Sequence, residues 1–300
     1  MPSIPSHLIP YAALASVCFF WGTTYLVIRI ALESFPPMLL VCGRFLLSGS
    51  ILLAVVWFRR IAIPGGSQLV VSAIHGVLIL GVGSGCLTIS ELWIPSSLAA
   101  LFVSVSPFWM VGMEALRSGG DRLRGPVVAG MLVGLAGAAL LVAPGLAISG
   151  FGGNIGKGFL ILQIGSVCWS LGSIRQRSLA SKQDPVAAAA VQQMVVGLVY
   201  VLPALLVPQG PVQWSARGIS AVLYLAVFGS VVGYTSYLYA LHHLPIAVVS
   251  LYTYINPVVA ALLGRLFYRE PFGEREALAM GLILAGVAIV KKFSGSRDQL

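Results

Sequence analysis

The sequence predicts an all-α integral membrane protein whose ten transmembrane helices form two inverted repeats of five helices. Of its 300 residues, 58% are hydrophobic and only 9% are charged, and the mean hydropathy is +0.95. A soluble globule could not keep that much apolar surface away from water. The other two observations are a series of apolar runs of transmembrane length and a sequence pattern that returns 148 positions later, as from Trp21 to Trp169.

The apolar runs are each about 20 residues long, which is enough to cross a hydrocarbon core of about 30 Å. The predicted spans are residues 11–30, 37–58, 68–90, 95–117, 124–143, 156–178, 185–207, 217–241, 245–267 and 274–291. The shortest polar breaks are Glu91–Pro95 and His242–Pro245. Both are kept as breaks, because a merged run would be far too long for one crossing and a proline is well placed to begin a helix.

Positively charged residues orient the ten spans, which put both termini on one side of the membrane. With a cytoplasmic N-terminus, the inner loops and helix ends hold eleven of the 18 Lys and Arg residues and the outer ones hold six, with Arg44 set aside as internal. Cytoplasmic termini are therefore expected. The net charge of +9 has this topological explanation, and no basic stripe with interleaved aromatic residues points to nucleic acid.

The repeat extends through both halves of the chain. The matched pairs are Trp21 with Trp169, Arg44 with Gln192, Gly49 with Gly197, Gly81 with Gly229 and Gly85 with Gly233, each 148 positions apart, then Pro95 with Pro245 and Pro107 with Pro257, 150 positions apart. Membrane helices reuse Gly, Pro and Trp often, but ordered matches in successive segments argue against chance. Because five is an odd number, the two halves, residues 1–147 and 148–300, must cross the membrane in opposite senses, as in many secondary transporters.

Four stretches carry a family resemblance. They are WGTTYLVIRI at 21–30, RFLLSG at 44–49, GSVVGYTSYLYALHHLP at 229–245 and YINPVVAALLGRLFYREPFGERE at 254–276. Together they resemble the ten-helix EamA type of the drug/metabolite transporter superfamily. The resemblance implies a bacterial inner-membrane exporter with a central cavity between its halves, in a branch that includes amino-acid and metabolite exporters. One departure is that SGGDRL at 118–123 stands where the second half has REPFGE at 269–274, so a role for Glu270 does not carry over to the first half.

Three ionisable residues lie inside predicted spans, where a charge costs about 2.5–3.5 kcal/mol on insertion scales. His75 could donate to a carboxylate or couple transport to protons, or it could simply bond to a backbone carbonyl. Glu114 could carry a proton, but an ion pair with Arg44 or Arg117 is favoured. Arg44 could clamp a carboxylate. Its neutral repeat counterpart, and the arginine common here in the resembling family whatever the substrate, favour packing or gating over binding.

Aromatic and small polar residues on shared helix faces are the other candidates for substrate binding. Phe102, Ser106 and Trp109 have i, i+4, i+7 spacing, and Tyr252 and Asn256 are the repeat equivalents of the first two. The expected substrate-binding residues are Trp21, His75, Phe102, Ser106, Trp109, Trp169, Tyr234, Tyr237, Tyr252, Tyr254 and Asn256. Tryptophan and tyrosine also form interfacial belts, but several of these lie too deep for that. They would line a mostly apolar pocket of loose specificity.

The favoured function is a secondary active or facilitative exporter that works by alternating access. Gly81, Gly85, Gly229 and Gly233 are expected to allow close helix contact, and Pro107 and Pro257 to permit flexure. The expected solute is an amino acid, aromatic ones included, or a related amphipathic metabolite. Proton coupling stays open, and a monomer is expected to be sufficient.

Two other classes of function were weighed. A membrane enzyme would show clustered ligands or paired acids, but the sequence has no HExxH, GxSxG or phosphate-binding glycine loop, and its four cysteines show no CxxC spacing. No catalysis, metal or cofactor is therefore expected. A sensor or receptor that binds solutes without moving them is the alternative reading.

Overall fold

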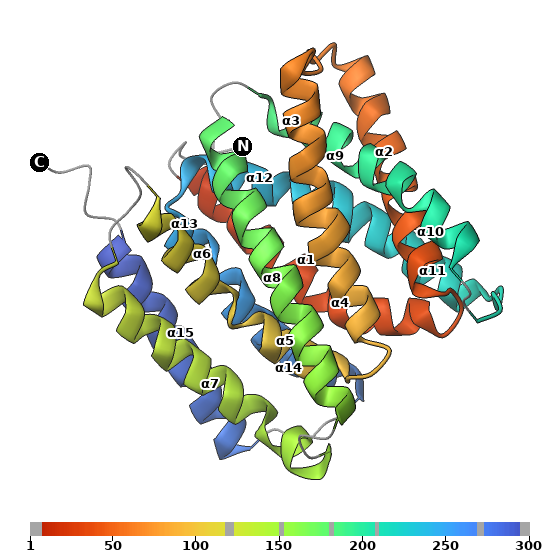
Figure 1. Cartoon of the computed structure of the whole chain (residues 1–300). Coiled ribbons are helices and arrows are strands. Elements are labelled where there is room, and N and C mark those ends of the chain that lie inside the picture. Colours follow the sequence, from red (N-terminus) through yellow and green to blue (C-terminus); the bar gives the residue numbers. More distant parts are fainter. Residues whose placement is uncertain are drawn as a thin grey trace, which may run out of the picture.

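The computed structural model describes residues 8–117, 123–149, 153–179, 183–207, 210–268 and 273–294, and within them every regular element is a helix (Figure 1). In chain order these are α1 (Ile9–Leu32), α2 (Pro37–Phe58), α3 (Ser67–Gly76), the π-helical η2 (Val77–Ser84), α4 (Gly85–Ser90), α5 (Ser96–Val103), α6 (Ser106–Leu116), α7 (Gly125–Ser149), α8 (Gly153–Leu179), α9 (Pro185–Val199), α10 (Val201–Leu206), α11 (Ala216–Tyr224), the π-helical η4 (Leu225–Val232), α12 (Gly233–His243), α13 (Ile246–Val249), α14 (Tyr252–Tyr268) and α15 (Glu274–Ser294).

These helices build the ten predicted spans. Among the described residues, eight helical stretches are long and apolar enough to cross a membrane, by length and composition, and the shorter apolar stretches Gly125–Leu140 and Ile246–Val259 supply the fifth and ninth. The breaks predicted at Glu91–Pro95 and His242–Pro245 are confirmed, since α4 ends at Ser90 before α5 and α12 ends at His243 before α13.

Proline and capping residues fix where several helices begin. Pro37 and Pro185 occupy the first turns of α2 and α9, where a missing backbone N–H costs nothing. Asp184 caps α9 by accepting hydrogen bonds from the backbone N–H groups of Val186 and Ala187, at 2.8 and 3.2 Å.

The two halves pack equivalent helices against each other. The second span packs along the seventh (α2 with α9) and the fifth along the tenth (α7 with α15), and these pairs form opposite edges of the molecule in Figure 1. Between them, α1 of the first half packs against α12 and α14, while α8, its counterpart in the second half, packs against η2 and α6. This reciprocal pattern is what two inverted five-helix repeats produce.

The two π-helical segments lie at equivalent places in the repeats. Val77–Ser84 and Leu225–Val232 are offset by 148 residues, and each is followed by a glycine, Gly85 or Gly233. The sequence did not predict these wider turns, which often occur at functional sites.

The fourth span is interrupted near its middle, at Ser104–Val105, and the ninth after its first turn, at Ser250–Leu251. The hydroxyl of Ser104 donates to the carbonyl oxygen of Thr253 at 2.9 Å, so one break rests against the other. Of the two prolines expected to permit flexure, Pro107 stands in the first turn of α6, where it starts a helix, and Pro257 alone lies inside one.

Glycines let α2 and α9 approach closely. A Cβ built on Gly49 would lie 2.7 Å from the backbone nitrogen of Met194, and one on Gly197 would lie 2.6 Å from that of Leu46. Each contact is the repeat copy of the other. Without a hydrophobic driving force between helices in lipid, such small-residue contacts are a main source of packing energy.

The four glycines predicted to allow close contact behave differently from one another. A Cβ on Gly85 would collide with the hydroxyl of Tyr200, one on Gly233 would lie 2.6 Å from Nε1 of Trp21, and one on Gly229 would meet neighbours at 3.0 Å. Gly81 is the exception, because a Cβ there would have its nearest neighbour at 3.6 Å, an ordinary contact. Its backbone carbonyl instead accepts a hydrogen bond from the Tyr200 hydroxyl at 2.7 Å.

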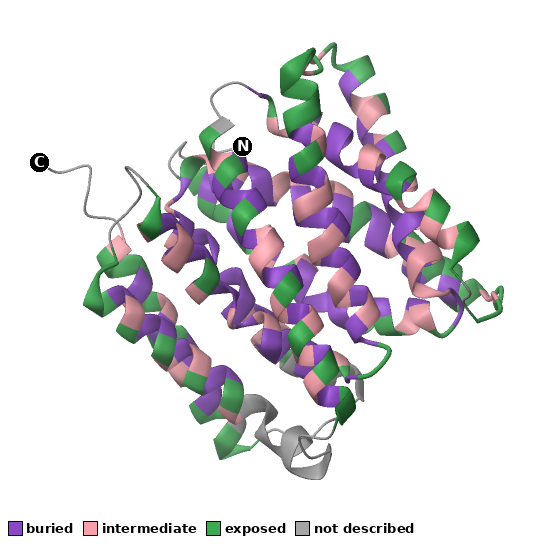
Figure 2. Cartoon of the chain, in the orientation of Figure 1, coloured by how far each residue is buried: buried purple, intermediate pink, exposed green. Residues whose placement is uncertain are grey.

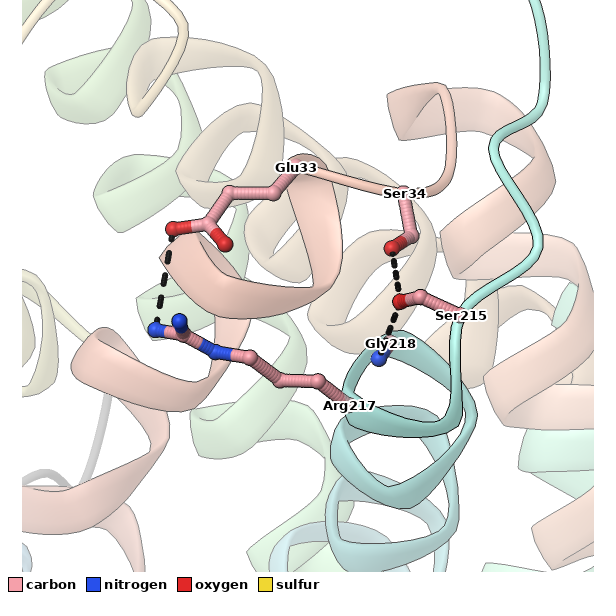
Figure 3. A network of polar contacts seen from close by, with 5 residues as sticks. All are labelled: Glu33, Ser34, Ser215, Arg217 and Gly218. Atoms are coloured by element: carbon pink, nitrogen blue, oxygen red, sulfur yellow. Dashed lines mark hydrogen bonds and ion pairs between the residues drawn. The ribbon is translucent and has the colours of Figure 1, made fainter.

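Hydrogen bonds tie the loop that follows α1 to the start of α11 (Figure 3). The hydroxyl oxygens of Ser34 and Ser215 lie 2.7 Å apart, and Ser215 also accepts from the backbone N–H of Gly218 at 2.9 Å. Arg217 and Glu33 form an ion pair at 3.8 Å, which contributes little because both side chains are more than half exposed. These contacts join the first half to the second between the loop after α1 and the start of α11.

Burial is greatest where the central helices meet. Figure 2 shows buried residues concentrated on the inner faces of the helices and exposed ones along the outer faces of α7 and α15. Many exposed side chains are large and apolar, such as Leu132, Leu160, Leu202 and Leu284, as expected of surfaces that face lipid rather than water.

We expect Gly49→Ala to destabilise the protein by about 1–3 kcal/mol, because its methyl group overlaps the backbone of Met194. Gly43→Ala, on the same helix, is the matched control, since nothing lies within 4 Å of a Cβ built there. Thermal unfolding in detergent measures both. Equal melting temperatures for the two variants would contradict the close α2–α9 contact.

Candidate functional site

A central cavity lies between the two halves and occupies about 700 Å³, its open mouth included. It is lined by Trp21, Thr24, Tyr25 and Ile28 of α1, Arg44 and Phe45 of α2, Leu80, Gly83, Ser84 and Leu87 of the third span, Val103 and Ser106 of the fourth, Leu162, Gly165, Ser166 and Trp169 of α8, Gly229, Ser230 and Tyr234 of the eighth, and Tyr252 and Asn256 of α14. Most of this lining is apolar, with hydroxyl groups, one amide and one guanidinium as polar groups.

The cavity occupies one side of the molecule. On α1 the lining residues run from Trp21, at mid-helix, to Ile28, near the end of the helix that lies away from the N-terminus. Leu87, near the end of the third span, and Leu162, in the first half of α8, lie toward that same side. On the N-terminal side, a packed cluster that includes Val17, Met110, Ile174, Tyr237 and Leu241 closes the passage.

Aromatic rings form the inner end of the cavity. Trp21 and Trp169, which are repeat counterparts, meet edge to face with their ring centroids 5.3 Å apart, and Tyr252 lies 4.9 Å from Trp21. The indole N–H of Trp21 donates to the carbonyl oxygen of Gly229 at 2.8 Å. That of Trp169 donates to the Tyr237 hydroxyl at 3.0 Å. The indole of Trp21 is thus fixed by a bond across the interface between the halves, and that of Trp169 by a bond within the second half.

A chain of buried hydrogen bonds runs from the cavity wall to His75. The hydroxyl of Tyr234, which lines the cavity, donates to Oε1 of Gln192 at 2.5 Å. The amide of Gln192 donates to Oε1 of Gln176 at 2.8 Å, and Nδ1 of His75 lies 3.1 Å from that same oxygen. Because an amide oxygen only accepts, Nδ1 of His75 must carry a proton. Gln176 also lines a second hollow of about 230 Å³, on the N-terminal side, with His242.

Six of the eleven expected substrate-binding residues line the cavity, and so does Arg44. The six are Trp21, Ser106, Trp169, Tyr234, Tyr252 and Asn256. Tyr237 lies directly behind them, where its hydroxyl bonds to Trp169 and to Ser173 at 2.6 Å. His75 reaches the cavity only through the hydrogen-bond chain.

The remaining three expected residues lie outside the cavity. Phe102 is buried against Phe159, and Tyr254 lies against Gly134 of α7 with its hydroxyl donating to Met131 at 3.0 Å. Trp109 is 37% exposed and donates to Gln163 at 2.9 Å. For Phe102 and Trp109, the break at Ser104–Val105 interrupts the helical face that was assumed to carry both residues.

Glu114 also lies outside the cavity. Its carboxylate is 4.0 Å from the guanidinium of Arg117, one turn away, which agrees with the favoured ion pair. It is therefore not the partner of Arg44.

Sequence reasoning missed several lining residues. Tyr25 and Ile28 follow Trp21 at i+4 and i+7, so the spacing of α1 could have identified them. Thr24, Ser84 and Ser230 gave no signal, because small hydroxyl residues are common on the packed faces of membrane helices.

The sequence also gave no signal for Glu91, which lies in the turn after α4 and is fully buried. The guanidinium of Arg29 donates to its backbone carbonyl oxygen, while its carboxylate oxygens have no hydrogen-bond partner among the described residues. Burial raises the pKa of this carboxyl, and the positive charge of Arg29 opposes that rise only in part.

Comparison with known proteins agrees with this architecture. The EamA-like transporter family matches residues 8–143 and again residues 156–291. YedA of Escherichia coli K12, described as an uncharacterized inner membrane transporter, is 34% identical over 290 residues, which cover 95% of this chain and 91% of YedA. The transporter YvbV of Bacillus subtilis is 25% identical and covers 92% of this chain and 90% of YvbV.

A crystal structure of a protein that is 23% identical superposes with a TM-score of 0.77, covering 97% of this chain and 99% of the other, so the fold is shared. The two ranges of the family match are the two halves whose helices pack together around the cavity. The chain therefore belongs to the EamA-like transporter family, and it is a multi-pass inner-membrane transporter of the drug/metabolite type.

Proposed function

We propose that this transporter exports amino acids, aromatic ones included, and related small amphipathic metabolites across the inner membrane by alternating access. The observation that carries the proposal is the cavity between the halves, closed on the N-terminal side and lined by aromatic rings with a few hydroxyl and amide groups. Such a lining suits solutes that have an apolar side chain and a polar end, and it selects loosely among them.

With both termini in the cytoplasm, the cavity faces outward in this conformation. Export then requires a second conformation in which the two halves exchange roles. The repeat suggests one step of that exchange. Gly81 is the counterpart of Gly229, so in the inward-facing state the indole of Trp169 would donate to the Gly81 carbonyl, as that of Trp21 now does to Gly229. The Tyr200 hydroxyl, which now occupies the Gly81 carbonyl, would have to leave it.

A proton gradient would drive the export, with His75 as the group that gains and loses the proton. The hydrogen-bond chain through Gln176 and Gln192 joins its imidazole to Tyr234 in the cavity wall. A change in the proton count of His75 would alter the donor and acceptor roles along this chain, and so alter the closed side of the cavity.

Trp169→Ala and Tyr252→Ala are each expected to lower flux about tenfold, because each removes an aromatic surface worth roughly 1.4 kcal/mol to the bound solute. Trp109→Ala, which removes an indole outside the cavity, should transport normally. Uptake of labelled phenylalanine into proteoliposomes measures all three. Wild-type flux in both cavity variants would remove them from the site, and saturable binding without any flux would favour a sensor.

Reporter fusions test the orientation. A reporter attached at Met1 should be active in the cytoplasm, and one inserted at residue 150, between the halves, should be active outside. Both reporters in one compartment would contradict the inverted repeat, whatever the transport assay gives.

His75→Gln should abolish stimulation of flux by a proton gradient while leaving solute exchange in its absence intact, since glutamine can hydrogen-bond to Gln176 but cannot titrate. His243→Gln is the matched control, because that exposed imidazole lies away from the cavity and has its one described hydrogen bond to the carbonyl of Tyr239, 2.8 Å away. Gradient-driven stimulation that persists in His75→Gln would assign coupling elsewhere.

A further inference from the structure

The guanidinium of Arg44 is the single charged group among the described residues that line the cavity. Arg44 is only 7% exposed and lies near the middle of the membrane-spanning α2. Its Nε donates to the hydroxyl of Ser230 on η4 at 2.8 Å, and its guanidinium carbon lies 5.1 Å from the ring centroid of Phe45. These two contacts hold the side chain in place at the edge of the cavity.

Most of its hydrogen-bonding capacity is unused. A guanidinium has five N–H donors, and the bond from Nε to Ser230 is the one that Arg44 makes to another described side chain or backbone group. The terminal nitrogens have space because position 229 is a glycine, where a Cβ would lie 3.0 Å from Nη2. Four donors are therefore left for a molecule in the cavity.

Its positive charge has no counter-charge nearby. No aspartate or glutamate lines the cavity among the residues described, and the two ion pairs found in the same part of the chain, Glu114 with Arg117 and Glu33 with Arg217, lie elsewhere. An uncompensated charge inside a membrane protein is costly unless it meets a partner there. A bound anion would be that partner.

The repeat provides an internal comparison. Gln192, the counterpart of Arg44, is neutral, does not line the cavity, and has its amide fully engaged with Ser72, Gln176 and Tyr234. The fold therefore accommodates an uncharged, satisfied side chain at this position. The fold thus does not require the charge and the free donors of Arg44 at this position, for which the sequence alone had favoured packing or gating.

We propose that Arg44, steadied by Ser230, binds the carboxylate of the transported solute through its terminal N–H groups, so that the substrates are small monocarboxylates with an apolar body. A planar guanidinium matches a carboxylate with two parallel bonds. A single arginine in a mostly apolar lining would leave one charge of a dianionic phosphate uncompensated, which favours the monoanion. This inference rests on the proposed transport function and names the group of the solute that is recognised.

The test compares three probes that differ only in their charged groups: phenylalanine, phenylalaninamide and 3-phenylpropionate. Ligand-induced shifts of the melting temperature of the purified protein report binding without any need for flux. Wild-type protein should bind both carboxylates at least about tenfold more tightly than the amide. Equal affinity for the amide, or preference for it, in the unmodified protein would overturn the proposal.

Variants locate the effect. Arg44→Gln should erase the preference for carboxylates, and Arg44→Lys should keep part of it, because lysine keeps the charge but not the two-pronged geometry. Ser230→Ala, which removes the support but not the charge, should keep the preference at reduced affinity. A preference that survives in folded Arg44→Gln protein would overturn the proposal. If that variant does not fold, the wild-type probe series and Ser230→Ala decide. Carboxylate binding without transport would instead refute the proposed transport function, but not the proposed binding site.

Discussion

The structure depends on one constraint: its two five-helix halves must pack against each other inside a hydrocarbon core, where there is no water. In a hydrocarbon core, backbone polar groups must bond within helices, and apolar side chains gain nothing by leaving the lipid. Close packing then depends on helix surfaces whose shapes fit each other. The crossing of α2 and α9 shows this directly, since Gly49 and Gly197 each admit the backbone of the facing helix. The same crossing places Arg44, one and a half turns earlier on α2, beside η4 and the cavity.

The cavity combines the symmetry of the repeat with a departure from it. Trp21 and Trp169 face each other as counterparts, yet one indole bonds to a backbone carbonyl and the other to a tyrosine. The positions of Arg44 and Gln192 differ more strongly, since one carries a charge at the cavity and the other lies in the middle of a hydrogen-bond chain behind it. Two similar halves therefore build a site whose two ends are chemically distinct. This difference suits the solute proposed above, which has a polar end and an apolar body.

The sequence predicted the spans and the repeat well, because both depend on properties that add up along a helix: length, apolar content and recurring small residues. Prediction of the site was less complete. Trp109 was placed in the pocket on helical periodicity, but the turn at Ser104–Val105 ends that periodicity before α6. The π-helical segments were missed for a related reason, since VLILGVGS and LAVFGSVV have nothing in their composition that distinguishes a wider turn from an ordinary one. The burial of Glu91 depends on the neighbours of a turn, which only the assembled fold supplies.

The fixed positive charge of Arg44 beside the cavity bears on how a cell keeps its ion gradients. Bacteria store work as gradients of H⁺, Na⁺ and K⁺, and any hollow that opens alternately to both sides is a route by which these could leak. A guanidinium at 7% exposure, bordering a hollow of low polarity, repels small inorganic cations strongly because little water screens it. In the transport cycle proposed above, Arg44 would therefore oppose the leakage of such cations at the point where solutes pass.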